Sequence, residues 1–142
     1  MPLQRAKALY IAYKKALDKI YETSPRGHIP ADAHVQAIRM AVKTPQPRFW
    51  ITQDRAYRIL RAILRGHEPT PTWVTRSSLN RELLNAYYRL SKQRMFRDMP
   101  LRFITDFVTL EPASGFFMSV SRAGRAISAY RKYLKQHHDY GV

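Results

Sequence analysis

The side chains in this sequence that could do chemistry are arginines and lysines in two matched segments, in which Arg55, Arg58 and Arg65 align with Arg122, Arg125 and Lys132. Two separate segments each contain such a set. The members are Arg55, Arg58, Arg61 and Arg65 in the first segment and Arg122, Arg125, Lys132 and Lys135 in the second. Guanidinium and ammonium groups bind phosphate oxygens, and the guanidinium fork also fits the edge of guanine. The pattern therefore predicts contact with a polyanion.

The composition of the whole chain has the same bias. Its 142 residues include 25 Lys and Arg but only 10 Asp and Glu, which gives a net charge of +15 and an isoelectric point near 10.6. Arg outnumbers Lys by 17 to 8, a preference that a merely solubilising surface does not require, although high-GC coding would also produce it. Because 45% of the residues are apolar, the composition is that of a folded domain and not of a disordered polycation.

Residues for other kinds of chemistry are sparse. Without Cys the chain has no thiol nucleophile, no disulfide and no Cys-based zinc site. The five histidines lack the spacing and the neighbouring carboxylates of a zinc site. A metal-dependent nuclease would need scattered acids such as Asp54, Asp106 and Glu111 to meet on folding. We therefore expect no enzyme activity, no cofactor and no small-molecule substrate.

Apolar residues at helical spacing predict the elements that position the cations. The expected helices cover residues 3–22, 30–42, 53–65 and 78–97, and a last helix, capped by Ser119 or Ser121, ends near Gln136. Thr52 offers an N-cap for the 53–65 helix, and Gly66 closes it. Residues 101–110 fit a helix and an alternating strand equally well.

The sequence also indicates an internal duplication. When the chain is aligned with itself so that 45–56 falls on 112–123, Pro, Phe, Arg and Ala are identical. With one residue of slack, the apolar positions of residues 35–42 fall on those of 101–108, which favours a helix over 101–110. The predicted fold is therefore mainly α: a helix, a second helix, a Pro loop, a short extended segment and a third helix, twice. A minor two-stranded β ribbon between the two extended segments is left open.

We predict a single compact domain over residues 1–142, with pseudo-symmetric halves 1–66 and 76–142 joined by a linker, residues 67–75. Each half alone would bury little apolar surface, so the halves are expected to pack together. The net charge is +9 up to Gly66 and +6 beyond it, so the excess is not a detachable tail. On the matched helices the basic positions project to the side opposite the apolar ones, with Arg55 at the border between the two sides.

Two further groups of residues have alternative interpretations. Cations near the end of the predicted 78–97 helix could contact a phosphate backbone, or they could simply complement the helix dipole. They are Arg89, Lys92, Arg94 and Arg97. Four aromatics of the extended segments could stack on bases, but burial in a small core is favoured. They are Phe49, Trp50, Phe116 and Phe117, and the role of Trp73 in the linker is left open.

These observations favour a non-enzymatic nucleic-acid-binding protein, with duplex DNA ahead of RNA, that contacts phosphates through the two matched helices. An architectural or regulatory role in a phage or mobile element fits this profile. The alternative is a structural or assembly component of a virion or ribonucleoprotein, whose basic surface holds a permanent polyanion partner. Bulky apolar residues are absent from the basic faces, which argues against a membrane surface as the partner.

The sequence also bears on location and assembly. No apolar run is long enough to cross a bilayer, and the first residues lack the apolar core of a signal peptide. Together with the absence of Cys, this predicts a cytoplasmic protein. Sequence preference is left open, and so is a homodimer or larger assembly.

Overall fold

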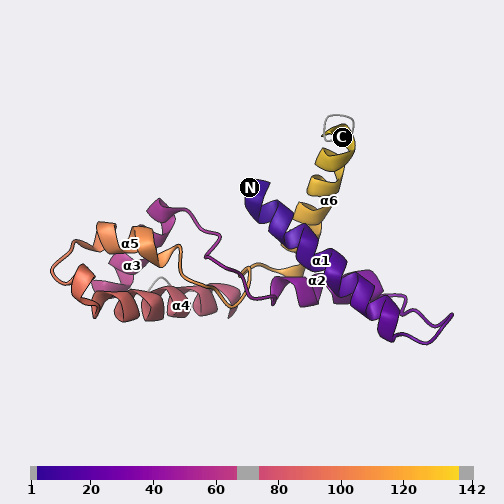
Figure 1. Ribbon diagram of the computed structural model, residues 1–142, viewed down its shortest axis with the longest axis horizontal. Coiled ribbons are helices and arrows are strands. Elements are labelled where there is room, and N and C mark those ends of the chain that lie inside the picture. Colours follow the sequence, from indigo (N-terminus) through magenta and orange to yellow (C-terminus); the bar gives the residue numbers. More distant parts are fainter. Residues whose placement is uncertain (1–2, 67–73, 138–142) are drawn as a thin grey trace. The chain divides into compact units, whose positions relative to one another are not determined.

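The computed structural model describes residues 3–66 and 74–137, which fold into helices joined by short loops (Figure 1). In chain order the elements are α1 (Leu3–Thr23), α2 (Ala33–Val42), α3 (Gln53–Leu64), α4 (Val74–Ser91), the 3-10 turn η1 (Arg94–Phe96), α5 (Leu101–Val108) and α6 (Val120–His137). The mainly α class is confirmed, and residues 101–108 form a helix. Most of the predicted linker, with Trp73, lies outside the described residues.

Local sequence sets the ends of the matched helices α3 and α6. The hydroxyl of Thr52 accepts a hydrogen bond from the backbone N–H of Arg55, at 3.2 Å. The hydroxyl of Ser119 accepts one from the N–H of Arg122, also at 3.2 Å, so Ser119 is the capping residue. Gly66 follows α3 with a φ of 82°, which residues with a side chain rarely adopt. The predicted start and stop signals of α3 are therefore confirmed.

The prediction for the 78–97 helix was wrong at both ends. Helix α4 begins at Val74 and ends at Ser91, and η1 follows it. The physical reason for the early end is Phe96, whose side chain is buried. A tight turn, in which the N–H of Phe96 donates to the carbonyl of Gln93 at 3.0 Å, brings this ring into the core. A continued helix would carry it past that core.

The described chain forms two compact units. The continuous unit is Pro45–Phe117, and it contains α3, α4, η1 and α5. The split unit combines Met1–Thr44 with Met118–Val142, and it contains α1, α2 and α6. Within each unit every α-helix packs against the other two, and Figure 1 shows both groups of helices.

These units differ from the predicted halves 1–66 and 76–142. Helix α3 follows α1 and α2 in sequence but packs with α4 and α5. Helix α6 follows α4 and α5 but packs with α1 and α2. The pseudo-symmetric halves therefore stay a prediction, and each compact unit takes its helices from both of them.

Each unit has an apolar core that includes a buried alanine, on α3 in the continuous unit and on α6 in the split unit. In the continuous unit Ala56 and Leu60 of α3 are completely buried, together with Leu83 of α4 and Val108 of α5. In the split unit Ala123 and Ile127 of α6 are buried with the apolar side of α1 and α2. A buried alanine lets neighbouring helices approach closely, and the larger residue one turn later fills the space between them.

Two of the four aromatics of the extended segments are placed by the core of the continuous unit: Phe49 belongs to it, and Phe117 packs against it. Phe49 and Phe116 are buried, while Trp50 and Phe117 are half-buried. The rings of Phe49 and Phe117 stack with their centroids 6.1 Å apart. The indole N–H of Trp50 donates to the side-chain oxygen of Gln46, at 3.1 Å. This placement agrees with the interpretation of these side chains as core.

One isolated antiparallel bridge joins the two Pro loops. The N–H of Gln46 donates to the carbonyl of Ala113 at 2.8 Å, and the N–H of Ala113 donates to the carbonyl of Gln46 at 3.0 Å. Within the described ranges no strand forms, so the β ribbon is not confirmed. The bridge fixes the start of both extended segments instead.

Candidate nucleic-acid interface

Helix α3 presents its arginines on the side away from its core. Arg55, Arg58, Arg61 and Arg65 are all exposed at α3 or directly after it. Ala56 and Leu60 fix this orientation, because their complete burial turns one side of the helix inward. Helix α3 therefore has its apolar side in the core of the continuous unit and its arginines on the solvent side.

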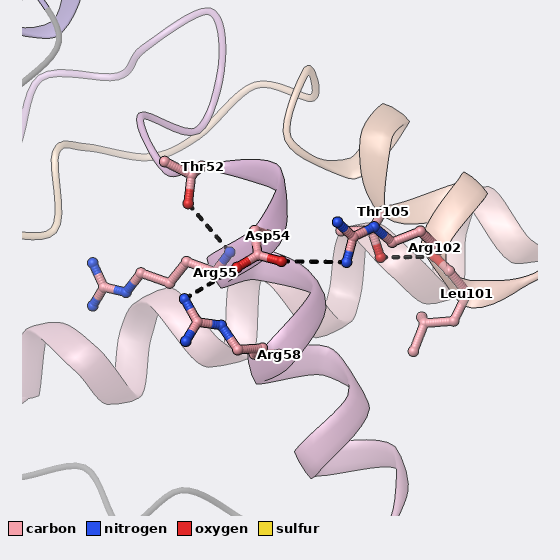
Figure 2. Close-up of polar contacts among 7 residues, drawn as sticks. All are labelled: Thr52, Asp54, Arg55, Arg58, Leu101, Arg102 and Thr105. Atoms are coloured by element: carbon pink, nitrogen blue, oxygen red, sulfur yellow. Dashed lines mark hydrogen bonds and ion pairs between the residues drawn. The ribbon is translucent and has the colours of Figure 1, made fainter.

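An aspartate interrupts this cationic surface, as Figure 2 shows. The carboxylate of Asp54 lies 3.2 Å from the guanidinium of Arg58 and 3.4 Å from that of Arg102. All three side chains are more than half exposed, so these pairs contribute little to stability. Their effect is on charge and orientation: one anion holds two cations in place beside the first turn of α3.

Arg102 on α5 is a residue that the sequence analysis missed. Besides its ion pair it lies over the ring of Tyr57, with its guanidinium carbon 4.7 Å from the ring centroid. Nothing in the local sequence signals this contact, because Asp54 and Arg102 are 48 residues apart. The continuous unit therefore adds a fifth arginine next to the four that were predicted.

Helix α6 presents a cationic surface without an acidic residue. Arg122, Arg125, Lys132 and Lys135 are all exposed, and Val120–His137 contains no Asp or Glu. In the alignment of 45–56 with 112–123, Ser121 of α6 takes the place of Asp54 in α3. Among the described residues no carboxylate forms an ion pair with these four side chains. Within the described ranges, the positive charge of α6 is therefore not offset by ion pairs.

The second predicted group is spread over the end of α4, the following loop and η1. Arg89, Lys92, Arg94 and Arg97 are all exposed. Only Arg89 lies in the last turn of α4, where the dipole interpretation applies. Its guanidinium is 3.5 Å from the carboxylate of Glu111. The other three surround the turn that buries Phe96.

The twelve predicted residues thus divide between the units, eight in the continuous unit and four in the split unit. The split unit has further exposed cations on α1, which the sequence analysis did not select. They are Lys7, Lys14, Lys15 and Lys19. Their spacing follows the polar side of an amphipathic helix, a signal that was visible but is usual for any solvated face.

A tyrosine–histidine contact joins α1 and α2 in the split unit, with Tyr13 buried and His34 exposed. The hydroxyl of Tyr13 lies 2.5 Å from Nδ1 of His34, and the Tyr13 ring is almost completely buried. Burial raises the pKa of Tyr13, and the positive charge of Arg131 partly offsets this effect. The pair orients α2 against α1, and the charge of Arg131 acts on it from α6.

The described part of the chain contains neither a cluster of metal-ligating side chains nor a membrane-spanning helix. No group of three or more His, Asp or Glu side chains gathers there as metal ligands would. None of the described helices combines the length and the apolar character needed to cross a membrane. No protein-family model matches this chain, and comparison with curated proteins and with solved structures finds no match.

Proposed function

We propose that this protein binds nucleic acid without catalysis, and that the exposed cations of α3 and α6 contact the phosphate backbone of duplex DNA. The observation that carries the proposal is α6, with five exposed Arg and Lys side chains, no acidic residue, and a buried apolar side. Each phosphate that such a cation neutralises releases bound counterions, which is the main source of sequence-independent affinity. If α6 only faced solvent, it would gain nothing from carrying charges of one sign alone.

Helix dimensions support duplex DNA ahead of RNA. An α-helix with its side chains is about 10–12 Å across. The major groove of B-form DNA is about 12 Å wide, whereas that of A-form RNA is too narrow for side chains to read. Helices such as α3 and α6, with cations on the outer side, suit the wider groove. An architectural or regulatory role would follow from such binding.

We also infer that the chain is an internal duplication, on the basis of matched burial. Helices α1 and α4 share four buried positions with the same spacing of four, three and four, and α1 also buries Ala12. The four positions are Leu9, Tyr13, Ala16 and Ile20 in α1 and Leu79, Leu83, Ala86 and Leu90 in α4. The third helices agree when 45–56 is aligned with 112–123, because Ala56 and Leu60 then correspond to Ala123 and Ile127.

Hydrogen bonds support the same inference. The capping residues Thr52 and Ser119 correspond in this alignment, and their cap hydrogen bonds have the same length. Gln46 and Ala113 also correspond, and each donates to the other. Equivalent residues that exchange the same bonds are expected where two copies of one segment meet in a self-complementary contact.

If the duplication is accepted, the two copies have exchanged their third helices. The first copy supplies α1 and α2 to the split unit but α3 to the continuous unit. The second copy supplies α4 and α5 to the continuous unit but α6 to the split unit. The predicted linker, residues 67–75, is then a connection between copies and not a boundary between folding units.

The function is tested by fluorescence anisotropy of labelled duplex DNA, duplex RNA and single-stranded DNA at several salt concentrations. We expect binding at low salt, tightest for duplex DNA, with log affinity falling linearly against log salt. The variant R122A/R125A/K132A/K135A should bind more weakly and with a shallower slope. S128A/Q136A is the matched control, because it changes two exposed neutral side chains of the same helix. Absence of salt-dependent binding to every probe would exclude the proposal.

A further inference from the structure

Three large apolar side chains project from the surface around η1. Met95 is 60% exposed, Met99 is 45% exposed and Phe103 is 40% exposed. They follow one another at every fourth position, and Met95 is the most exposed large apolar side chain in the described part of the chain. Exposed apolar side chains that are grouped in this way indicate a binding surface more often than scattered ones do.

The backbone beneath these side chains is well anchored. Phe96 is buried, and its ring packs against those of Phe103 and Phe107, with centroids 6.2 Å and 5.1 Å away. The N–H of Met99 donates to the carbonyl of Phe96 at 3.1 Å. The projection is therefore held by the core of the continuous unit and presents its methionines in a defined position. We call Met95, Met99 and Phe103 the η1 wedge.

Cations flank the η1 wedge on each side. Arg94 and Arg97 are the neighbours of Met95 and Phe96, and Arg102 directly precedes Phe103. All three are exposed. Asp98 is the only acid in residues 92–103, against four Arg and Lys residues, so this segment has an excess of positive charge. Its charge is complementary to a polyanion.

The equivalent loop of the split unit lacks these features. Residues 24–32 connect α1 to α2, as residues 92–100 connect α4 to α5. Ile29 is the only large exposed apolar side chain in that loop, and Arg26 is its only cation apart from histidine. The wedge therefore belongs to one unit alone and is not a by-product of the shared architecture.

We propose that Met95 and Met99 insert between base pairs of a bound duplex and kink it, while Arg94 and Arg97 bind the phosphates on either side. Phe103 packs against Phe96, the buried ring that anchors the turn. Minor-groove architectural proteins use apolar side chains in this way, and the cost of unstacking is offset by the contacts that the bend permits. This inference rests on the proposed function and specifies what the protein does to the DNA.

The size of the wedge favours a duplex over a membrane. A helix that binds a lipid surface buries a continuous apolar face to a depth of about 5–10 Å. Three side chains, each exposed only in part, are too few for that but enough for one or two base steps. The neighbouring cations are arginines, whose forked donors fit phosphate oxygens in pairs.

The test uses a duplex of about 30 base pairs with a fluorescent dye at each end, so that bending shortens the distance between the dyes. The full-length protein is compared with M95A/M99A and with L110A, a control that removes a 54% exposed side chain of the same unit. We expect energy transfer to rise with the unchanged protein and with L110A. M95A/M99A should still bind, within about tenfold in affinity, but should leave the duplex straight.

Two results would overturn the wedge while leaving the proposed function intact. One is binding by the unchanged protein without any change in energy transfer, and the other is equal bending by M95A/M99A. Failure to bind any nucleic acid would overturn the proposed function as well. Vesicles with anionic lipid are included as a third probe. If the unchanged protein bound vesicles but did not bend DNA, and M95A/M99A no longer bound vesicles, the wedge would be assigned to a membrane. Melting curves confirm that both variants are folded.

Discussion

The two units of this protein differ in the type of cation that they carry. The continuous unit has eleven Arg and a single Lys among residues 45–117, with six acidic residues. The split unit has six Arg and seven Lys, with four acidic residues. Lysine is a flexible point charge, whereas arginine forms forked bonds in a fixed plane. Similar architectures thus carry two different kinds of basic surface.

Ion pairs follow the same division. The three pairs seen among the described residues, at Arg58, Arg89 and Arg102, all lie in the continuous unit. Helix α6 of the split unit has no acidic residue to pair with. In the continuous unit, acidic partners orient three arginines but reduce the net positive charge. In α6, no acid of the helix reduces the charge, and none holds the basic side chains in place. We accordingly expect α6 to supply affinity and the continuous unit to supply position.

The largest expected effects on stability come from substitutions in the two cores, which test which helices belong to each unit. L60A on α3 and I127A on α6 each remove a completely buried side chain and should lower the free energy of unfolding by about 2–5 kcal/mol. Hydrogen exchange of the full chain is the measurement. L60A should raise exchange in α4 and α5, and I127A should raise it in α1 and α2.

The decisive result is the location of the change and not its size. If L60A mainly exposed α1 and α2, which precede it in sequence, the exchange of third helices would be refuted. S128A is the control for I127A, because Ser128 is the exposed next residue of the same helix. It should change the exchange of neither unit.

The next effect is on the salt dependence of DNA binding. Each cation that contacts a phosphate contributes about 0.9 to the slope of log affinity against log salt. R122A/R125A/K132A/K135A should therefore reduce the slope by about 3–4. R55A/R58A/R61A/R65A should reduce it by less, because Asp54 already shares its charge with Arg58. Equal reductions would remove the electrostatic distinction between α3 and α6.

The helix caps should show where the two units are alike. T52A and S119A each remove a hydroxyl that accepts a backbone N–H at 3.2 Å. Both should lower the free energy of unfolding by about 1 kcal/mol, because an N–H of the first turn loses its acceptor. Chemical denaturation measures this loss. A large difference between the two variants would argue against equivalent positions in a duplication.

The smallest effect concerns the acid that distinguishes α3. D54S gives the continuous unit the residue that α6 has at Ser121, and S121D makes the reverse change. D54S should lower stability by less than about 1 kcal/mol, since its ion pairs are exposed. It should raise DNA affinity, and S121D should lower it, in the anisotropy assay. If both changes left affinity unaltered, Asp54 would lie outside the DNA-binding surface.

Sequence reasoning predicted most closely those features that depend on neighbouring residues. The start and end of α3 follow from Thr52 and Gly66, which act within one turn. The exposure of the predicted cations on α3 and α6 follows from amphipathic spacing alone. The end of α4 was missed because it depends on Phe96 finding a core built partly by α5, which helical periodicity does not report.

The partners of the third helices could not be predicted in the same way. Periodicity shows which side of a helix is apolar, but it does not show which apolar side it meets. Helices α3 and α6 present the same order of small and large buried residues, at Ala56 and Leu60 and at Ala123 and Ile127. From sequence alone, the buried side of α3 or of α6 could pack equally well against α1 and α2 or against α4 and α5. Long-range contacts such as that of Arg102 with Asp54 are hidden for the same reason.

The split unit also constrains the order in which the chain can fold on the ribosome. Helices α1 and α2 are synthesised before any part of the continuous unit, but α6 follows all of it. The segment Pro45–Phe117 can complete its core as soon as it has emerged, because it needs no later residue. The helices that are made first must therefore wait longest, with their apolar sides uncovered, until α6 arrives.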